Sequence, residues 1–116
     1  MSFTLPTLPY DYTVLEPFVD SQTMHLHHDM HHNAYVTKLN DALKGQAQTD
    51  IIAIQKSAST ASAAVRNNGG GHYNHSLFWN WMAKPGSSNT APSGDLKAKV
   101  SKCKEMYFTH FPFYID

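Results

Sequence analysis

Apolar side chains recur at helical spacing between residues 21 and 44 of this chain. The repeating positions, separated by four, four, five and four residues, are Leu26, Met30, Ala34, Leu39 and Leu43. This pattern predicts one amphipathic helix of about 36 Å whose apolar stripe faces the core. Asp20 or Ser21 can cap its N-terminus, and Gly45 is placed to end it. Residues 1–19 contain three prolines and are expected to form an extended arm.

A second helical region is expected after a polar turn at residues 46–49. Asp50 can cap a helix that begins at Ile51, and residues 94–104 again have helical character. Residues 57–64 are all small, which allows either the close approach of another helix or a weakly specified linker. Residues 84–92 are rich in Pro, Gly, Ser and Asn and predict a loop. The pattern therefore predicts an all-α chain without internal repeats.

Composition narrows the class of protein. The 116 residues suit one domain, and nine basic side chains balance nine acidic ones, so no basic surface for nucleic acid is expected. No apolar run approaches the ~18 residues of a membrane span. The first residues match neither a signal peptide nor a transit segment, and the single cysteine, Cys103, excludes an internal disulfide. A cytoplasmic or organelle-matrix location is therefore expected.

Seven of the eight histidines fall into two blocks, residues 25–35 and 67–79. On a helix, His27, His31 and Tyr35 lie one turn apart on the same face. The second block follows three glycines, which weaken a helix by roughly 1 kcal/mol each and so indicate a close neighbour or space beside an ion. Imidazoles one turn apart can bind a metal, although a single helical histidine is more often solvated or hydrogen-bonded. Both interpretations are open at this point.

Several motifs occur in order along the chain. They are Leu5-Pro-Thr-Leu-Pro-Tyr10, Gln22-Thr-Met24, His27-His28, His31-His32-x-x-Tyr35, the run Arg66-Asn-Asn-Gly-Gly-Gly-His-Tyr-Asn-His-Ser-Leu-Phe-Trp79, and Ser93-Gly-Asp-Leu-Lys97. On these residues the chain resembles the N-terminal half of the iron/manganese superoxide dismutase family, from about residue 3 to Val100. We therefore expect residues 1–100 to form that family's N-terminal helical-hairpin domain and residues 101–116 to form a divergent aromatic tail.

The resemblance implies a long antiparallel helical hairpin whose second helix continues through the glycines to about Met82. In the family an α/β C-terminal domain follows and supplies two more metal ligands from a D-x-W-x-x-H segment. The 116 residues contain no such segment, so that domain is missing from the sequence. The uncovered hairpin and the aromatic tail are then expected to leave the chain marginally stable or self-associating. The tail aromatics are Tyr107, Phe108, Phe111, Phe113 and Tyr114.

The resemblance also implies roles for individual residues. His27 and His75 match the family's metal ligands, while His31 and Tyr35 match catalytic residues that orient solvent and help to deliver protons. The ion is expected to be manganese, with iron possible, because Gly71 stands where iron-type members often carry Gln. The residues that match the shell keeping the site dry are Phe78 and Trp79. The histidines expected to make only structural hydrogen bonds are His28, His32 and His72.

Two functions of different class follow from these expectations. The first is a superoxide dismutase, which converts superoxide to dioxygen and hydrogen peroxide through one-electron cycling of the bound ion; members of the family are homo-oligomers. The second is a truncated, inactive His-rich helical hairpin that binds a metal or a partner without turnover. The missing second pair of ligands favours the second function for the 116 residues as written.

Overall fold

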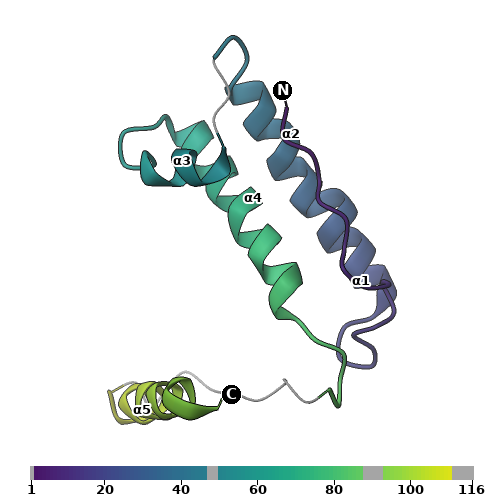
Figure 1. Ribbon diagram of the computed structural model, residues 1–116, viewed down its shortest axis with the longest axis vertical. Coiled ribbons are helices and arrows are strands. Elements are labelled where there is room, and N and C mark those ends of the chain that lie inside the picture. The colour runs from purple at the N-terminus through teal and green to yellow at the C-terminus, as the bar shows by residue number, and fades with distance from the viewer. Residues whose placement is uncertain (1, 47–49, 88–92, 111–116) are drawn as a thin grey trace. The chain divides into compact units, whose positions relative to one another are not determined.

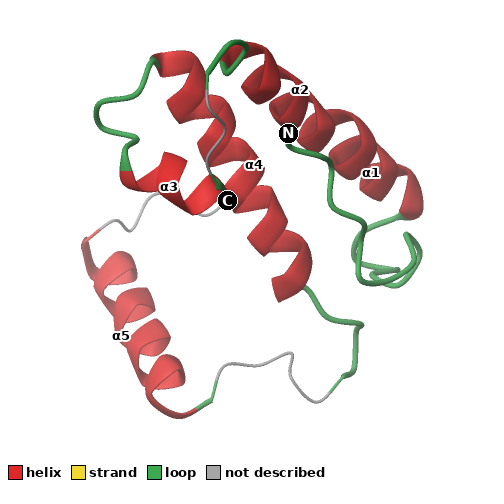
Figure 2. Cartoon of the chain, turned by 45° about the horizontal axis from the view of Figure 1, so that its top comes forward, coloured by secondary structure: helices red, strands yellow, loops and turns green. Residues whose placement is uncertain are grey.

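The computed structural model describes residues 2–46, 50–87 and 93–110, and side chains only as far as residue 102. Every regular element in these residues is helical, and none is a strand (Figure 2). The all-α prediction is therefore confirmed. None of the described helices combines the length and apolar character that a membrane crossing needs. Much of the turn expected at 46–49, part of the loop at 84–92 and the aromatic side chains of the tail lie outside the described residues.

Contacts divide the chain into two compact units, residues 1–85 and residues 86–116. The described part of the second unit is a helix, α5 (Gly94–His110), which confirms the helical character expected at 94–104. The domain boundary expected at residue 100 stays a prediction.

The first half of the first unit is one continuous helical rod. It consists of α1 (Ser21–His25), the π-helical segment η1 (Leu26–His32) and α2 (Asn33–Ala42). Asp20 caps it as expected, because its carboxylate accepts the backbone N–H of Thr23 at 2.7 Å. The prediction of a uniform α-helix is wrong at η1, where the hydrogen-bond ladder is wider; the N–H of Asn33, for example, reaches the carbonyl of His28 five residues back.

The second half of the unit returns antiparallel to the rod. Helix α3 (Ile51–Lys56) is short, and α4 (Ala63–Trp81) runs back beside α2 and η1 (Figure 1). The predicted hairpin is therefore confirmed. The prediction that its second helix is continuous is wrong, because α3 and α4 are separate helices. Residues 57–62 interrupt it because the hydroxyls of Ser57 and Thr60 bond backbone carbonyls, after which Ser62 caps a new helix.

The buried face of the rod differs from the predicted apolar stripe. Leu26 and Met30 are 52% and 64% exposed, and only Leu39 of that stripe is fully buried. The buried positions of the rod are Met24, His28, His32, Val36 and Leu39. Two histidines thus occupy core positions, which is tolerable because their ring nitrogens are hydrogen-bonded. Of the expected stripe, Leu26, Met30 and Ala34 are left on the surface.

Two apolar clusters and an N-terminal arm hold the hairpin together. Leu15, Met24 and Trp79 form one buried cluster near the open end of the hairpin. The other cluster lies near the turn and is formed by Leu39, Ile54 and Val65. The arm runs along the rod (Figure 1) and is fixed at Phe3, whose backbone N–H and carbonyl both bond the side chain of Asn40, and at Tyr10, whose hydroxyl donates to the carbonyl of Trp79.

Candidate metal centre

Three histidines from the two facing halves of the hairpin meet at one point. His27 and His31 come from η1, and His75 comes from α4. The Nε2 atoms of His27 and His75 are 3.0 Å apart although the residues are separated by 48 positions. One ligating nitrogen from each of the three histidines lies within 4.8 Å of the other two. Among the described residues, no Cys, Asp or Glu joins this cluster.

A hydrogen bond to the backbone fixes the tautomer of His75. Its Nδ1 lies 2.7 Å from the carbonyl oxygen of Gly71, which can only accept, so Nδ1 carries the proton. Nε2 is therefore a lone-pair donor aimed at His27. A backbone carbonyl behind an imidazole in this way is the usual support of a metal-binding histidine.

The environment also favours the neutral form of His27. Burial lowers the pKa of His27 below its usual value, and the neighbouring His75 and His31 lower it further. A neutral imidazole is the form that binds a metal. Burial beside the other two histidines therefore favours the metal-binding form of His27.

Aromatic side chains border the cluster on one side. The ring of His27 lies 4.9 Å from that of Trp79 and 5.5 Å from that of Phe78, measured between centroids. An open cavity of about 330 Å³ adjoins the histidines there. It is lined by His27, Asn74, His75, Leu77, Phe78 and Trp81. Of the two aromatics expected to keep the site dry, Trp79 is buried and Phe78 remains 40% exposed.

Tyr35 lies over the second helix at the glycine run. Its ring centroid is 5.0 Å from that of His31 and 5.3 Å from that of His75. A Cβ atom at Gly71 would stand 2.5 Å from the Tyr35 ring, so only glycine fits there. A Cβ atom at Gly69 would also be tight, at 3.1 Å from the Ile54 side chain, whereas one at Gly70 would make only an ordinary contact, at 3.8 Å from the Gln55 side chain. Gly69 and Gly71 therefore permit a close approach of neighbouring side chains, which is the first of the two explanations that the sequence allows.

The adjacent glycines provide a matched pair of substitutions. We expect Gly71→Ala to destabilise the fold by about 1–3 kcal/mol, because Tyr35 must move out of the site. We expect Gly70→Ala to stabilise it by about 0.5–1 kcal/mol through helix propensity alone. Urea denaturation followed by circular dichroism measures both. Equal effects of the two changes would contradict the packing described here.

A buried hydrogen-bond chain lies behind the cluster. The indole N–H of Trp79 donates to Nδ1 of His32 at 2.9 Å, so the proton of His32 is on Nε2, which donates to Nδ1 of His72 at 2.9 Å. Burial lowers the pKa of His32 to about 4 and also lowers that of His72, in both cases reinforced by neighbouring histidines. These contacts agree with the structural role expected for His32 and His72.

The hydrogen bonds that join Trp79, His32 and His72 make the metal-free fold sensitive to acid. An unfolded histidine binds its proton near pH 6.5, whereas folded His32 does so only near pH 4. Stability is therefore complete above pH 6.5 and falls, by up to about 3 kcal/mol, as the pH drops through this window. Urea titrations at pH 5.0 and 7.0 measure the loss. His32→Gln should flatten the dependence, and a wild-type stability that does not change over this range would refute the assignment.

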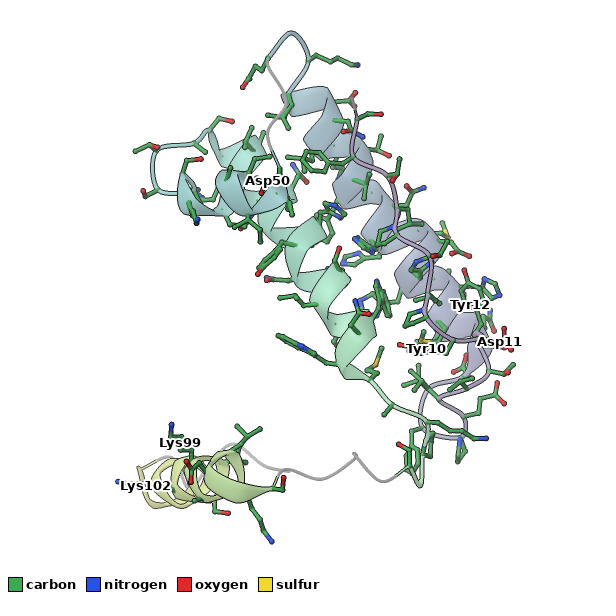
Figure 3. The ribbon with its side chains drawn as sticks, in the orientation of Figure 1. Tyr10, Asp11, Tyr12, Asp50, Lys99 and Lys102 are labelled. Atoms are coloured by element: carbon green, nitrogen blue, oxygen red, sulfur yellow. The ribbon has the colours of Figure 1, made fainter. Side chains whose placement is uncertain are left out.

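A second polar cluster, which the sequence did not indicate, fixes the arm to η1. The carboxylate of Asp29 accepts hydrogen bonds from the hydroxyl of Tyr12 at 2.6 Å and from Nδ1 of His25 and His28, each at 2.7 Å (Tyr12 is labelled in Figure 3). These donors, His25 foremost, hold the pKa of Asp29 well below its usual range. The bond to Asp29 is also the main reason that the pKa of Tyr12 is raised to about 12. Nε2 of His28 contacts the carbonyl of Pro6 at 2.8 Å, which agrees with the structural role expected for this residue.

A helical hairpin with histidines facing each other across its two halves defines an all-helical domain with a candidate metal site. Comparisons with known proteins identify the family of this domain. A family model described as iron/manganese superoxide dismutases, alpha-hairpin domain, matches residues 2–83. Proteins named superoxide dismutase (Mn/Fe) 2 from Staphylococcus aureus strains N315 and MW2 are each 47% identical to the chain over 105 residues. This chain belongs to the iron/manganese superoxide dismutase family.

The match covers 85% of this chain and 53% of each relative, so the chain spans about half the length of the curated relatives it matches. All four residues to which the sequence assigned a site role, His27, His31, Tyr35 and His75, lie together in the hairpin. Their individual roles stay predictions. The sequence did not predict that His31 would approach the other two histidines closely enough to belong to one potential ligand set.

Proposed function

We propose that this chain supplies the helical-hairpin half of a superoxide dismutase centre that uses manganese, or alternatively iron, with superoxide as substrate. One observation carries the proposal: His27 and His75, from opposite halves of the hairpin, direct Nε2 toward Nε2 at 3.0 Å. The names of the Staphylococcus aureus relatives support the same activity and the same pair of metals.

The donor set fits part of such a centre. Imidazole nitrogens bind manganese and iron, and these ions also take carboxylate ligands. Since no carboxylate joins the cluster among the described residues, the hairpin contributes the imidazole donors and the remainder has to come from outside it. Bound manganese or iron would supply the one-electron cycling that dismutation requires.

In this proposal each residue of the hairpin has a separate task. His27 and His75 hold the ion, and the carbonyl of Gly71 keeps the His75 ring in orientation. His31 is exposed at the mouth of the site and, with Tyr35 beside it, orients solvent and delivers protons to the substrate. The buried indole of Trp79 excludes water from one side.

Gly71 supports manganese over iron. Its position is the one at which iron-type members of the family often carry Gln. Here the Tyr35 ring occupies the space that a side chain at position 71 would need, so Gln cannot be accommodated without displacing Tyr35. The solvent-binding amide of a manganese-type centre has to come from another part of the protein.

The test is a comparison of two polypeptides. One is the 116-residue chain; the other joins its residues 1–100 to the part of the Staphylococcus aureus relative that follows the matched segment. After loading with manganese, we expect the joined protein to remove superoxide catalytically. An inactive joined protein that is folded and manganese-loaded would contradict the proposal.

The second candidate function is metal binding without turnover by the hairpin alone, and it is favoured for the isolated chain because no carboxylate among the described residues joins the cluster. We therefore expect the 116-residue polypeptide to show no dismutase activity above that of its free metal. Stopped-flow measurement of superoxide decay, with and without a chelator, decides this. Catalysis that survives the chelator and disappears in His75→Ala would rule out the second candidate.

A further inference from the structure

We infer that α5 (Gly94–His110) docks this chain on the surface of anionic phospholipid membranes. The inference concerns the second unit alone and does not depend on the proposed dismutase centre. It rests on three features of the helix: an exposed apolar stripe, lysines along both edges of that stripe, and an excess of positive charge. A bilayer that contains phosphatidylserine is the partner that matches all three.

The apolar stripe of α5 begins with Leu96 and Val100. They lie about one turn apart and are 62% and 37% exposed. The spacing of three or four residues continues in the sequence through Cys103 and Tyr107. Because α5 is the only regular element in the described part of the second unit, no other helix or strand of that part covers the stripe. Such a stripe gains stability when it is buried against an apolar partner.

Lysines border the stripe on both sides. Helical geometry places Lys97 and Lys104 along one edge and Lys99 along the other. Lys99 and Lys102, which Figure 3 labels, extend from the helix into solvent. None of the acidic side chains that the structure describes forms an ion pair with Lys97 or Lys99. A lysine at such an edge lays its methylene stem on the apolar surface and holds its ammonium group at the level of the lipid phosphates.

The charges of α5 favour an anionic partner over a second copy of the helix. The sequence of α5 contains four lysines and two acidic residues, although the whole chain has no net charge. If two copies paired through the stripe, the lysines along its edges would face one another and repel. An anionic bilayer offers phosphate groups to the lysines and acyl chains to the stripe.

The aromatic residues at the end of the chain agree with this partner. Aromatic side chains prefer the interface between membrane and water, and they commonly accompany basic amphipathic helices that lie on a bilayer. Five aromatic residues occur at or after the end of the stripe: Tyr107, Phe108, Phe111, Phe113 and Tyr114. The sequence of this region therefore favours a lipid surface over a purely polar anionic partner.

Vesicle binding by the 116-residue chain tests the inference. One set of vesicles contains phosphatidylcholine alone, and the other contains phosphatidylcholine mixed with phosphatidylserine. In co-sedimentation we expect binding to the anionic vesicles to be at least about tenfold tighter than to the neutral ones, and to weaken as salt is added. Equal binding to both sets, or no binding to either, would overturn the inference.

Two neighbouring substitutions separate the stripe from the charge of the helix. Val100→Asp places a carboxylate on the stripe, whereas Ser101→Asp adds the same charge outside it. Binding to the anionic vesicles should weaken by at least about 50-fold in Val100→Asp and by at most about fivefold in Ser101→Asp. If both variants lost the same affinity, the stripe would not be the contact surface.

A second pair of variants tests the lysines. Lys97→Gln combined with Lys99→Gln should weaken binding by about 25-fold, which is about fivefold for each lysine. Lys38→Gln combined with Lys84→Gln removes the same charge from the first unit and should leave binding within about twofold. Equal losses in the two pairs would show that net charge alone drives binding. Sedimentation equilibrium without vesicles covers the remaining alternative: a dimer that Val100→Asp abolishes would assign the stripe to a second copy of the chain and overturn the inference.

Discussion

Replacing Trp79 by alanine is expected to abolish cooperative folding of the hairpin. Trp79 is 2% exposed, packs with Leu15 and Met24, and donates its indole N–H to His32. Truncating a buried tryptophan costs about 3–5 kcal/mol, and the unpaired nitrogen of His32 adds to this. A domain of this size has only about 5–15 kcal/mol of net stability, so the substitution removes much or all of it.

The same helix contains a matched control two residues further on. Trp81 is 74% exposed, and Trp81→Ala should change the free energy of unfolding by no more than about 0.5 kcal/mol. Trp79→Phe should have an intermediate cost of about 1–3 kcal/mol, because the bulk is retained while the hydrogen bond is lost. Urea denaturation monitored by circular dichroism measures all three. If the two alanine variants were equally stable, Trp79 could not be the centre of the core.

The second large effect concerns catalysis in the joined protein described above. We expect His75→Ala to reduce its manganese-dependent superoxide turnover by at least about 100-fold, since even losing a residue that supports a ligand commonly costs 10- to 100-fold. His27→Ala should have a similar effect because its nitrogen faces the same point.

The control for these two variants is His25→Ala. His25 belongs to the same histidine-rich block but is exposed and bonds Asp29 rather than the cluster. Its loss should leave turnover within about twofold, provided that the metal content is equal. A loss of activity of equal size in all three variants would mean that the block acts through folding and not through metal binding.

The helices themselves could be predicted from sequence because their signals are local. Asp20 and Asp50 each precede a helix and accept its first backbone N–H groups, which is the ordinary capping arrangement. The π-helical turn at η1 and the interruption between α3 and α4 carry no comparable local signal. They depend on hydrogen-bond choices of residues such as Ser57 that become definite only in the folded chain.

The core was harder to predict from the sequence, because two of the buried positions of the rod are occupied by histidines and not by the apolar residues of the expected stripe. Periodicity shows that a helix has faces but not which face is buried. His28 and His32 are buried since partners from distant segments, Pro6, His72 and Trp79, satisfy their nitrogens. Leu26 and Met30 lie on the surface for lack of a neighbouring element in the described part of the unit. A partner 40 or more positions away cannot be read from spacing alone.

The candidate site was predicted more fully than the core. The motif resemblance identified His27, His31, Tyr35 and His75, and all four lie together. The fit of Tyr35 against Gly71 and the closeness of His31 to the other two imidazoles depend on how closely the two halves of the hairpin pack. Such details require the three-dimensional arrangement, because the glycines in the sequence indicate only a close neighbour or space beside an ion.

The most direct test of the pairing of His27 and His75 is a titration of the 116-residue chain with Mn²⁺, followed by nuclear magnetic resonance of its imidazole nitrogens. A bound paramagnetic ion broadens nearby signals first. We expect the resonances of His27, His75 and neighbouring His31 to disappear at substoichiometric Mn²⁺ while that of His25 persists. Broadening that begins at His25, or that spreads evenly over all eight histidines, would contradict a metal centre between the two halves of the hairpin.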